Sequence, residues 1–120
     1  MGNVLIIDDD PAIGEYMAKL VSYLGHQSVT ALSATDALAR LDGGGFDLTV
    51  ADICLPDAPE PAEWIRTLAG KTGGKPVVLI SGAPSQELID CANENGILAF
   101  LSKPFELAFI KSIFKSVFGT

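Results

Sequence analysis

The chain has 120 residues, a length that suits one domain with a single hydrophobic core. Its formal net charge is −7, from 15 acidic and 8 basic side chains, which argues against a nucleic-acid surface because binding phosphate groups needs a positive field. The same charge disfavours docking on anionic membranes, and no apolar run approaches the ~20 residues of a membrane span. Cys54 and Cys91 lack metal-type spacing, so we expect a reducing, cytoplasmic location.

Short apolar runs alternate with helical patterns along the whole chain. The first three predicted elements are a strand, a helix and a strand, over residues 3–7, 11–24 and 27–31. The next three are a helix, a strand and a helix, over residues 34–41, 46–51 and the segment around 64–68. The last four are a strand, a helix, a strand and a helix, over residues 77–80, 84–95, 97–101 and 105–118. Such strict alternation favours a parallel sheet with helices on both faces.

Several residues support these boundaries. Pro11 suits a first helical position, and Gly25 suits the end of that helix. Ser33 is a candidate N-cap for the second helix. Asp10 precedes Pro11, so we expect it to interact with the positive N-terminus of the first helix.

Polar side chains follow four of the five predicted strands. They are Asp8, Asp9 and Asp10 after the first strand, Asp52 after the third, Ser81 after the fourth and Lys103 after the fifth. Ligands of open parallel sheets bind at the carboxyl ends of the strands. We therefore expect these side chains to share one edge of the sheet.

Carboxylates a few ångströms apart raise one another's pKa, and a divalent cation relieves that cost. Oxygen ligands without histidine or cysteine favour Mg²⁺ over zinc, and Mg²⁺ commonly bridges to phosphate. Lys103 would add a fixed positive charge and Ser81 a hydroxyl donor. Asp52 stands alone after its strand, so it is the natural nucleophile for an acyl phosphate.

Four motifs carry a resemblance to a known family. They are "LIIDDDP" at the first strand, "VADICLP" at the third, "VLISG" at the fourth and "FLSKPF" at the fifth. With these motifs the chain resembles a response-regulator receiver domain of two-component signalling, over essentially all its length. The resemblance implies a single receiver domain over residues 1–120. It also implies a flavodoxin-like, doubly wound α/β fold of five β-α units, with parallel strands in the order 2-1-3-4-5.

The resemblance also implies the metal ligands and the phosphorylated residue. Asp52 would be the phosphoacceptor. Mg²⁺ would be held by Asp9 directly, by Asp8 through water, by Asp52, and by the backbone carbonyl of Cys54.

Three further positions match the family's switch and phosphate-binding residues. Ser81 would be a hydroxyl that moves toward the phosphoryl group, and Phe100 occupies the position of the switch aromatic. Lys103 would pair with the phosphate and precede a cis peptide bond to Pro104.

The implied function is a signalling switch that catalyses only its own phosphorylation and dephosphorylation. A histidine kinase or a histidine phosphotransfer protein would donate the phosphoryl group. The last helix carries two adjacent apolar stripes, formed by Phe109, Ile110, Ile113, Phe114, Val117 and Phe118. One stripe is enough to cover a sheet, so the second is surplus. We therefore expect the fourth helix, fifth strand and fifth helix to bind a second copy or an output domain, with no direct nucleic-acid or membrane contact.

The sequence departs from the family in the loop over residues 56–61. The family usually has a small turn here that contains an Asp-Gly pair. This chain has "DAPEPAEW" instead. Three prolines stiffen this loop, so its geometry is left open.

Two alternative functions remain open. One is a pseudo-receiver, an interaction module that is never phosphorylated. The other is a phosphatase of the haloacid-dehalogenase type with Asp8 as nucleophile, although Ala12 does not fit that motif.

Several residues also have plainer interpretations. Phe100 would serve equally as core, and Cys54 as a small buried filler or a backbone ligand. Cys91 is expected to pack in the core, Trp64 to anchor the third helix, and His26 to be solvated in a loop.

Overall fold

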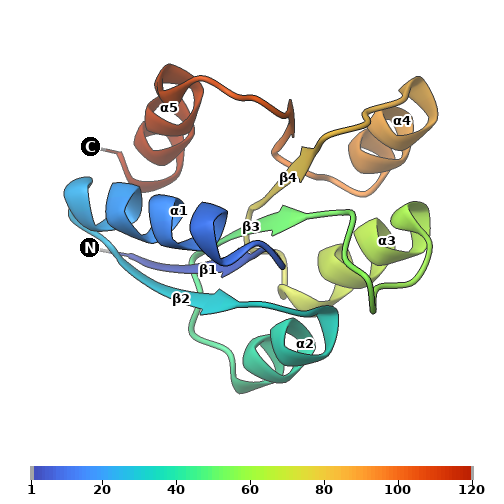
Figure 1. Ribbon diagram of the computed structural model, residues 1–120, viewed down its shortest axis with the longest axis horizontal. Coiled ribbons are helices and arrows are strands. Elements are labelled where there is room, and N and C mark those ends of the chain that lie inside the picture. The colour runs from blue at the N-terminus through green and yellow to red at the C-terminus, as the bar shows by residue number, and fades with distance from the viewer. Residues whose placement is uncertain (1, 120) are drawn as a thin grey trace.

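The computed structural model describes residues 2–119. Its strands form one parallel sheet in the order β2-β1-β3-β4-β5, and helices alternate with them along the chain (Figure 1). The strands are β1 (Asn3–Ile7), β2 (Gln27–Ala31), β3 (Leu48–Asp52), β4 (Val77–Ser81) and β5 (Ala99–Ser102). The helices are α1 (Pro11–Tyr23), α2 (Ala34–Gly43), α3 (Pro61–Lys71), α4 (Gln86–Glu94) and α5 (Leu107–Phe118). This confirms the flavodoxin-like fold expected from the sequence.

Two helix starts follow the predicted capping chemistry. The Asp10 carboxylate accepts a hydrogen bond from Ala12 N at 3.0 Å, and Pro11 is the first residue of α1. Ser33 Oγ accepts from Asp36 N at 3.0 Å and caps α2. Local polar side chains therefore determine where both helices begin.

Some predicted boundaries are wrong by about two residues. Strand β3 begins at Leu48 rather than at residue 46, and β5 begins at Ala99 rather than at residue 97. Before β3, the Asp47 carboxylate accepts from Asn3 N at 2.9 Å, so a side chain takes the donor that a longer β3 would use. Helix α4 begins at Gln86 rather than at residue 84, because Ser85 caps it by accepting from Leu88 N at 3.2 Å.

The sheet separates two hydrophobic cores. Helices α1 and α5 cover one face, and α2, α3 and α4 cover the other (Figure 1). Val4 and Ile6 of β1 point into the first core, whereas Leu5 and Ile7 point into the second. This alternation explains why β1 is apolar on both faces and why polar residues are confined to its ends.

Helix α5 is less exposed than its sequence suggested. Ile110 and Phe114 are buried, while Ile113, Val117 and Phe118 are half-buried against the α1 side of the sheet. Phe109 is the member of the two stripes that is left exposed, at 56%. The second stripe is therefore mostly packed against the core, and the large apolar side chains of α5 that stay exposed are Leu107 and Phe109.

His26 helps to bury the end of α5, and the expectation that its side chain is solvated is wrong. The side chain is only 8% exposed and its ring stacks on Phe118, with centroids 4.1 Å apart. Its Nδ1 accepts from Gly2 N at 2.9 Å. A short loop after Gly25 places the ring under the end of α5, a contact distant in sequence.

The buried His26 gives a prediction about acid stability. Burial lowers the pKa of His26 from its ordinary value of 6.5, so the unfolded chain binds a proton more readily than the folded protein. The stability that neutral His26 contributes is thus present above this value and is lost as the pH falls below it.

We expect His26→Phe, which keeps the ring stack, to flatten this dependence. The measurement is the free energy of unfolding in urea at pH 7.5 and pH 5.5 (roughly one unit either side of the unfolded pKa). The wild type should lose more stability than the variant over this interval, with one proton limiting the slope to about 1.4 kcal/mol per pH unit. Equal losses in the two proteins would contradict the assignment.

Candidate functional site

Three carboxylates meet at the carboxyl edge of the sheet. Asp8 follows β1, Asp9 follows Asp8, and Asp52 ends the neighbouring strand β3. Each offers an oxygen atom, and these atoms all lie within 4.8 Å of one another. Asp8 and Asp52 are 3% and 5% exposed, whereas Asp9 is exposed. The structure therefore brings together the acidic residues that the strand ends predicted.

Lys103 reaches this cluster from the loop after β5. Its Nζ lies 2.9 Å from Asp52 Oδ2 and 3.6 Å from Asp8 Oδ2. The backbone N of Lys103 donates to Ser81 O at 2.8 Å, which ties the loop to the end of β4. The peptide bond to Pro104 is cis, as the resemblance implied.

Burial dominates the electrostatics of Asp8. It raises the pKa of this carboxyl above 3.8, and the charges of Asp52 and Asp9 act in the same direction. A hydrogen bond from Asp10 N at 2.9 Å and the charge of Lys103 lower the pKa but only partly offset that effect.

Lys103 shows the opposite balance. Burial alone would lower the pKa of its ammonium, but the hydrogen bond and charge of Asp52, assisted by Asp8, raise it overall. Lys103 therefore remains a fixed positive charge beside Asp52.

The position of Asp52 is held from two sides. Its Oδ1 accepts from Cys54 N at 2.8 Å, and its backbone carbonyl accepts from Trp64 Nε1 at 3.2 Å. Trp64 is fully buried, which confirms its predicted role as the anchor of α3. The link from Trp64 to the Asp52 carbonyl was not foreseen, since nothing in the sequence indicates the direction of the indole N–H.

Three further residues singled out in the sequence are buried or half-buried. Ser81 ends β4, is fully buried, and its Oγ accepts from Ala83 N at 3.0 Å. Phe100 lies in β5, half-buried against the core on the α2–α4 side. Cys91 is buried as expected.

Cys54 is exposed, so its interpretation as a small buried filler is wrong. Ile53 and Leu55 on either side of it are buried in the core, which turns the Cys54 side chain outward. Its backbone carbonyl remains a candidate ligand.

The donor atoms fit Mg²⁺. Three carboxylates against one ammonium leave a formal charge of −2 when all are ionised, which one divalent cation balances. The donors of Asp8, Asp9 and Asp52 are all oxygens, the type that Mg²⁺ prefers.

Asp57 is a feature that the sequence analysis missed. Its Oδ1 accepts from Ala34 N at 2.8 Å, and its Oδ2 accepts from Thr35 N at 3.0 Å and from Thr35 Oγ1 at 2.9 Å. The hydrogen bonds from Ala34 and then Thr35 lower the pKa of Asp57. The proline-rich loop whose geometry was left open is thus joined to the start of α2. Nothing in the sequence indicates which helix this loop aspartate contacts.

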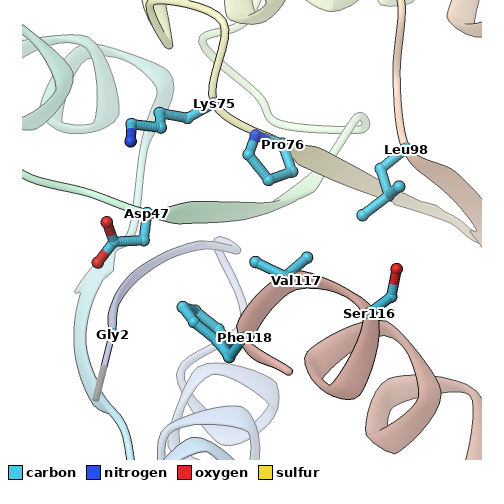
Figure 2. A pocket seen from close by; sticks show the side chains of 8 residues that line it. All are labelled: Gly2, Asp47, Lys75, Pro76, Leu98, Ser116, Val117 and Phe118. Atoms are coloured by element: carbon cyan, nitrogen blue, oxygen red, sulfur yellow. The ribbon is translucent and has the colours of Figure 1, made fainter. Parts of the chain in front are cut away.

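A concavity at the other end of the sheet lacks comparable chemistry. It has a volume of about 510 Å³ and lies beside the starts of β1, β3, β4 and β5 and the end of α5 (Figure 2). Asp47 and Lys75 are its charged side chains, and Leu98, Val117 and Phe118 make much of the rest apolar. It contains no cluster of acids, so the carboxyl edge is the candidate site.

Comparison with known proteins identifies the family. The model of the response regulator receiver domain matches residues 4–115. The chain therefore belongs to the response regulator receiver family, whose members are signalling switches that interact with histidine kinases or phosphotransfer proteins.

Curated relatives are longer than this chain. The swarming motility regulation protein RssB of Serratia marcescens is 28% identical over 117 residues, which are 96% of this chain and 52% of that protein. The two-component response regulator ORR21 of Oryza sativa is 26% identical over 116 residues, 95% of this chain and 16% of that protein. The chain thus spans about half of the first relative and much less of the second.

Solved structures share the fold over nearly the whole chain. The CheY-like receiver domain protein of Methanospirillum hungatei is 25% identical with a TM-score of 0.89, over 99% of this chain and 95% of that one. A Burkholderia pseudomallei response regulator, solved with a phosphorylated aspartic acid and a calcium ion, is 20% identical with a TM-score of 0.82, over 98% of this chain and 66% of that one.

In residues 2–119, no helix is long and apolar enough to cross a membrane.

The raised pKa of Asp8 leads to a prediction about stability without metal. Because the folded protein binds this proton more tightly than the unfolded chain, the stability from Asp8 is present below pH 3.8 and is lost as the pH rises through the folded pKa. At neutral pH the ionised carboxylate is therefore destabilising.

We expect Asp8→Asn, whose Oδ1 can still accept from Asp10 N, to raise the melting temperature by a few degrees at pH 7 in EDTA. The same variant should gain less stability than the wild type when Mg²⁺ is added. Thermal unfolding followed by circular dichroism measures both. A lower melting temperature in EDTA would show that the Asp8 charge is stabilising and would contradict this account.

Proposed function

We propose that residues 1–120 form a receiver domain whose Asp52 accepts a phosphoryl group in a Mg²⁺-dependent reaction. The donor is a phosphohistidine of a sensor histidine kinase or of a histidine phosphotransfer protein. The supporting observation is the placement of Asp52 within one acidic cluster and 2.9 Å from the Lys103 ammonium. The cytoplasmic location expected from the sequence stays a prediction.

The reaction needs few protein groups. A carboxylate oxygen of Asp52 attacks phosphorus, the P–N bond of the donor breaks, and its electron pair stays on the imidazole nitrogen. Lys103 is placed to neutralise charge on the phosphoryl oxygens. Asp9 and Asp52, the Cys54 carbonyl and, through water, Asp8 would hold Mg²⁺, which would supply further positive charge there. Attack of water on phosphorus then breaks the P–O bond to Asp52 and restores the carboxylate.

An apolar groove beside the site suits the donor protein. It has a volume of about 580 Å³ and is lined by Ala12, Ile13, Tyr16, Lys103, Pro104 and Phe105. Tyr16 is 52% exposed there. Because Lys103 belongs both to the groove and to the acidic cluster, a helix docked in the groove would bring its histidine close to Asp52.

Phosphorylation would act as a switch through Ser81 and Phe100. Ser81 Oγ would exchange its bond from Ala83 N for one to the phosphoryl group, and Phe100 would follow it inward. The equilibrium between two conformations of the α4-β5-α5 face would shift as a result. Leu107 and Phe109 are exposed on α5 and could contact a second copy or an output domain.

We expect acetyl phosphate with Mg²⁺ to add one phosphoryl group to the wild type and none to Asp52→Asn, as measured by intact mass. Asp10→Asn is the matched control, because Asp10 belongs to the same acidic run but caps α1 and lies outside the metal ligands. EDTA should abolish the added mass in both phosphorylatable proteins. A wild type that stays unmodified would favour the pseudo-receiver, and a modified Asp52→Asn would exclude Asp52 as the acceptor.

A further inference from the structure

The segment between β3 and α3, residues 53–60, connects the phosphorylation site to a neighbouring helix. At its start, Cys54 N donates to Asp52 Oδ1 at 2.8 Å. Three residues further on, Asp57 accepts three hydrogen bonds from Ala34 and Thr35 at the start of α2. Among residues 2–119, the side chain of Asp57 is the one in this segment that hydrogen-bonds another element. We call these three bonds the Asp57 clamp.

The clamp satisfies donors that α2 cannot satisfy itself. The first N–H groups of a helix have no partner within the helix. Ser33 Oγ accepts from Asp36 N, whereas Ala34 N and Thr35 N donate to Asp57. A carboxylate is favoured here because it bonds two N–H groups at once and lies at the positive end of the helix. The start of α2 is thus capped by its own residue and by the site loop.

The same part of the chain is also joined to the other side of the metal site. Asp8 N donates to Ala31 O at 3.1 Å, at the end of β2. Residues 31–35 therefore bond to Asp8 through Ala31 and to the loop after Asp52 through the clamp. Asp57 completes a continuous path of backbone and hydrogen bonds from Asp8 to Asp52.

We propose that Asp57 is a positioning residue for the phosphorylation site. The clamp holds residues 53–60 so that the Cys54 backbone faces the Asp52 carboxylate and the metal position before any metal binds. This proposal rests on the proposed function and adds a residue that sets the Mg²⁺ affinity of the site. Without the clamp, metal binding must also order the loop, and that ordering weakens affinity.

Three variants separate this role from general support of α2. Asp57→Asn keeps the size of the side chain but leaves one oxygen acceptor in place of two. Ser33→Ala removes the other cap of the same helix and leaves the clamp intact. Asp42→Asn removes an ion pair to Lys71 Nζ, 3.1 Å from Asp42 Oδ1, which also joins α2 to α3 but at their far ends.

The measurement is the Mg²⁺ dissociation constant of each purified protein by isothermal titration calorimetry, without a phosphodonor. We expect Asp57→Asn to bind Mg²⁺ about 3- to 10-fold more weakly, the scale of one or two lost hydrogen bonds. Ser33→Ala and Asp42→Asn should stay within about twofold of the wild type. With acetyl phosphate, Asp57→Asn should react slowly at low Mg²⁺ and recover the wild-type rate at saturating Mg²⁺.

Each other outcome has a distinct meaning. Wild-type affinity in Asp57→Asn overturns the inference, and equal weakening in Ser33→Ala reduces the clamp to ordinary helix capping and overturns it as well. A reaction rate that saturating Mg²⁺ does not restore also contradicts a role in positioning the metal loop. If the wild type itself binds no Mg²⁺, the proposed function fails together with the inference, and that result is distinguishable because it appears before any variant is made.

Discussion

The contact between the Lys103 ammonium and the Asp52 carboxylate, at 2.9 Å, is the interaction on which the site depends. Asp8 and Asp52 are almost completely buried, and two carboxylates in such surroundings repel each other unless a cation is near. Lys103 supplies that cation from the loop after β5, a strand that is not adjacent to β3, since β4 lies between them. The hydrogen bond from Lys103 N to Ser81 O links the loop after β5 to the end of β4.

One ammonium only partly balances three carboxylates. Burial, with a smaller contribution from the charges of Asp52 and Asp9, keeps the pKa of Asp8 raised despite Lys103, so the ionised carboxylate is unfavourable at neutral pH. The fold tolerates the buried negative charge because the charge is confined to the end of the sheet. Apolar side chains pack on both faces of β1 and β3. Such a local excess of negative charge is what makes a divalent cation bind. Stability and the proposed metal binding therefore make opposite demands on Asp8.

The sequence predicted best where local chemistry decides the structure. Ser33 and Asp10 cap helices because their side chains bond N–H groups two or three residues away. The grouping of Asp8, Asp52 and Lys103 was predictable as well, because parallel strands bring their carboxyl ends to one edge.

Features that depend on distant contacts could not be predicted. The burial of His26 depends on Phe118, and the exposure of Cys54 on how its neighbours Ile53 and Leu55 pack. Asp57 bonds a helix 22 positions away, so no local pattern shows its partner. The family pattern was of little help in the same loop, because three prolines replace its usual turn.

The most direct test of the central claim is to locate the phosphoryl group. After reaction with acetyl phosphate and Mg²⁺, borohydride reduces an aspartyl phosphate to homoserine, and mass spectrometry of the peptides then shows which residue was modified. We expect homoserine at position 52 and unchanged aspartates at positions 8 and 9. Homoserine at position 8 would instead support a phosphatase-type nucleophile and contradict the assignment of Asp8 to the metal.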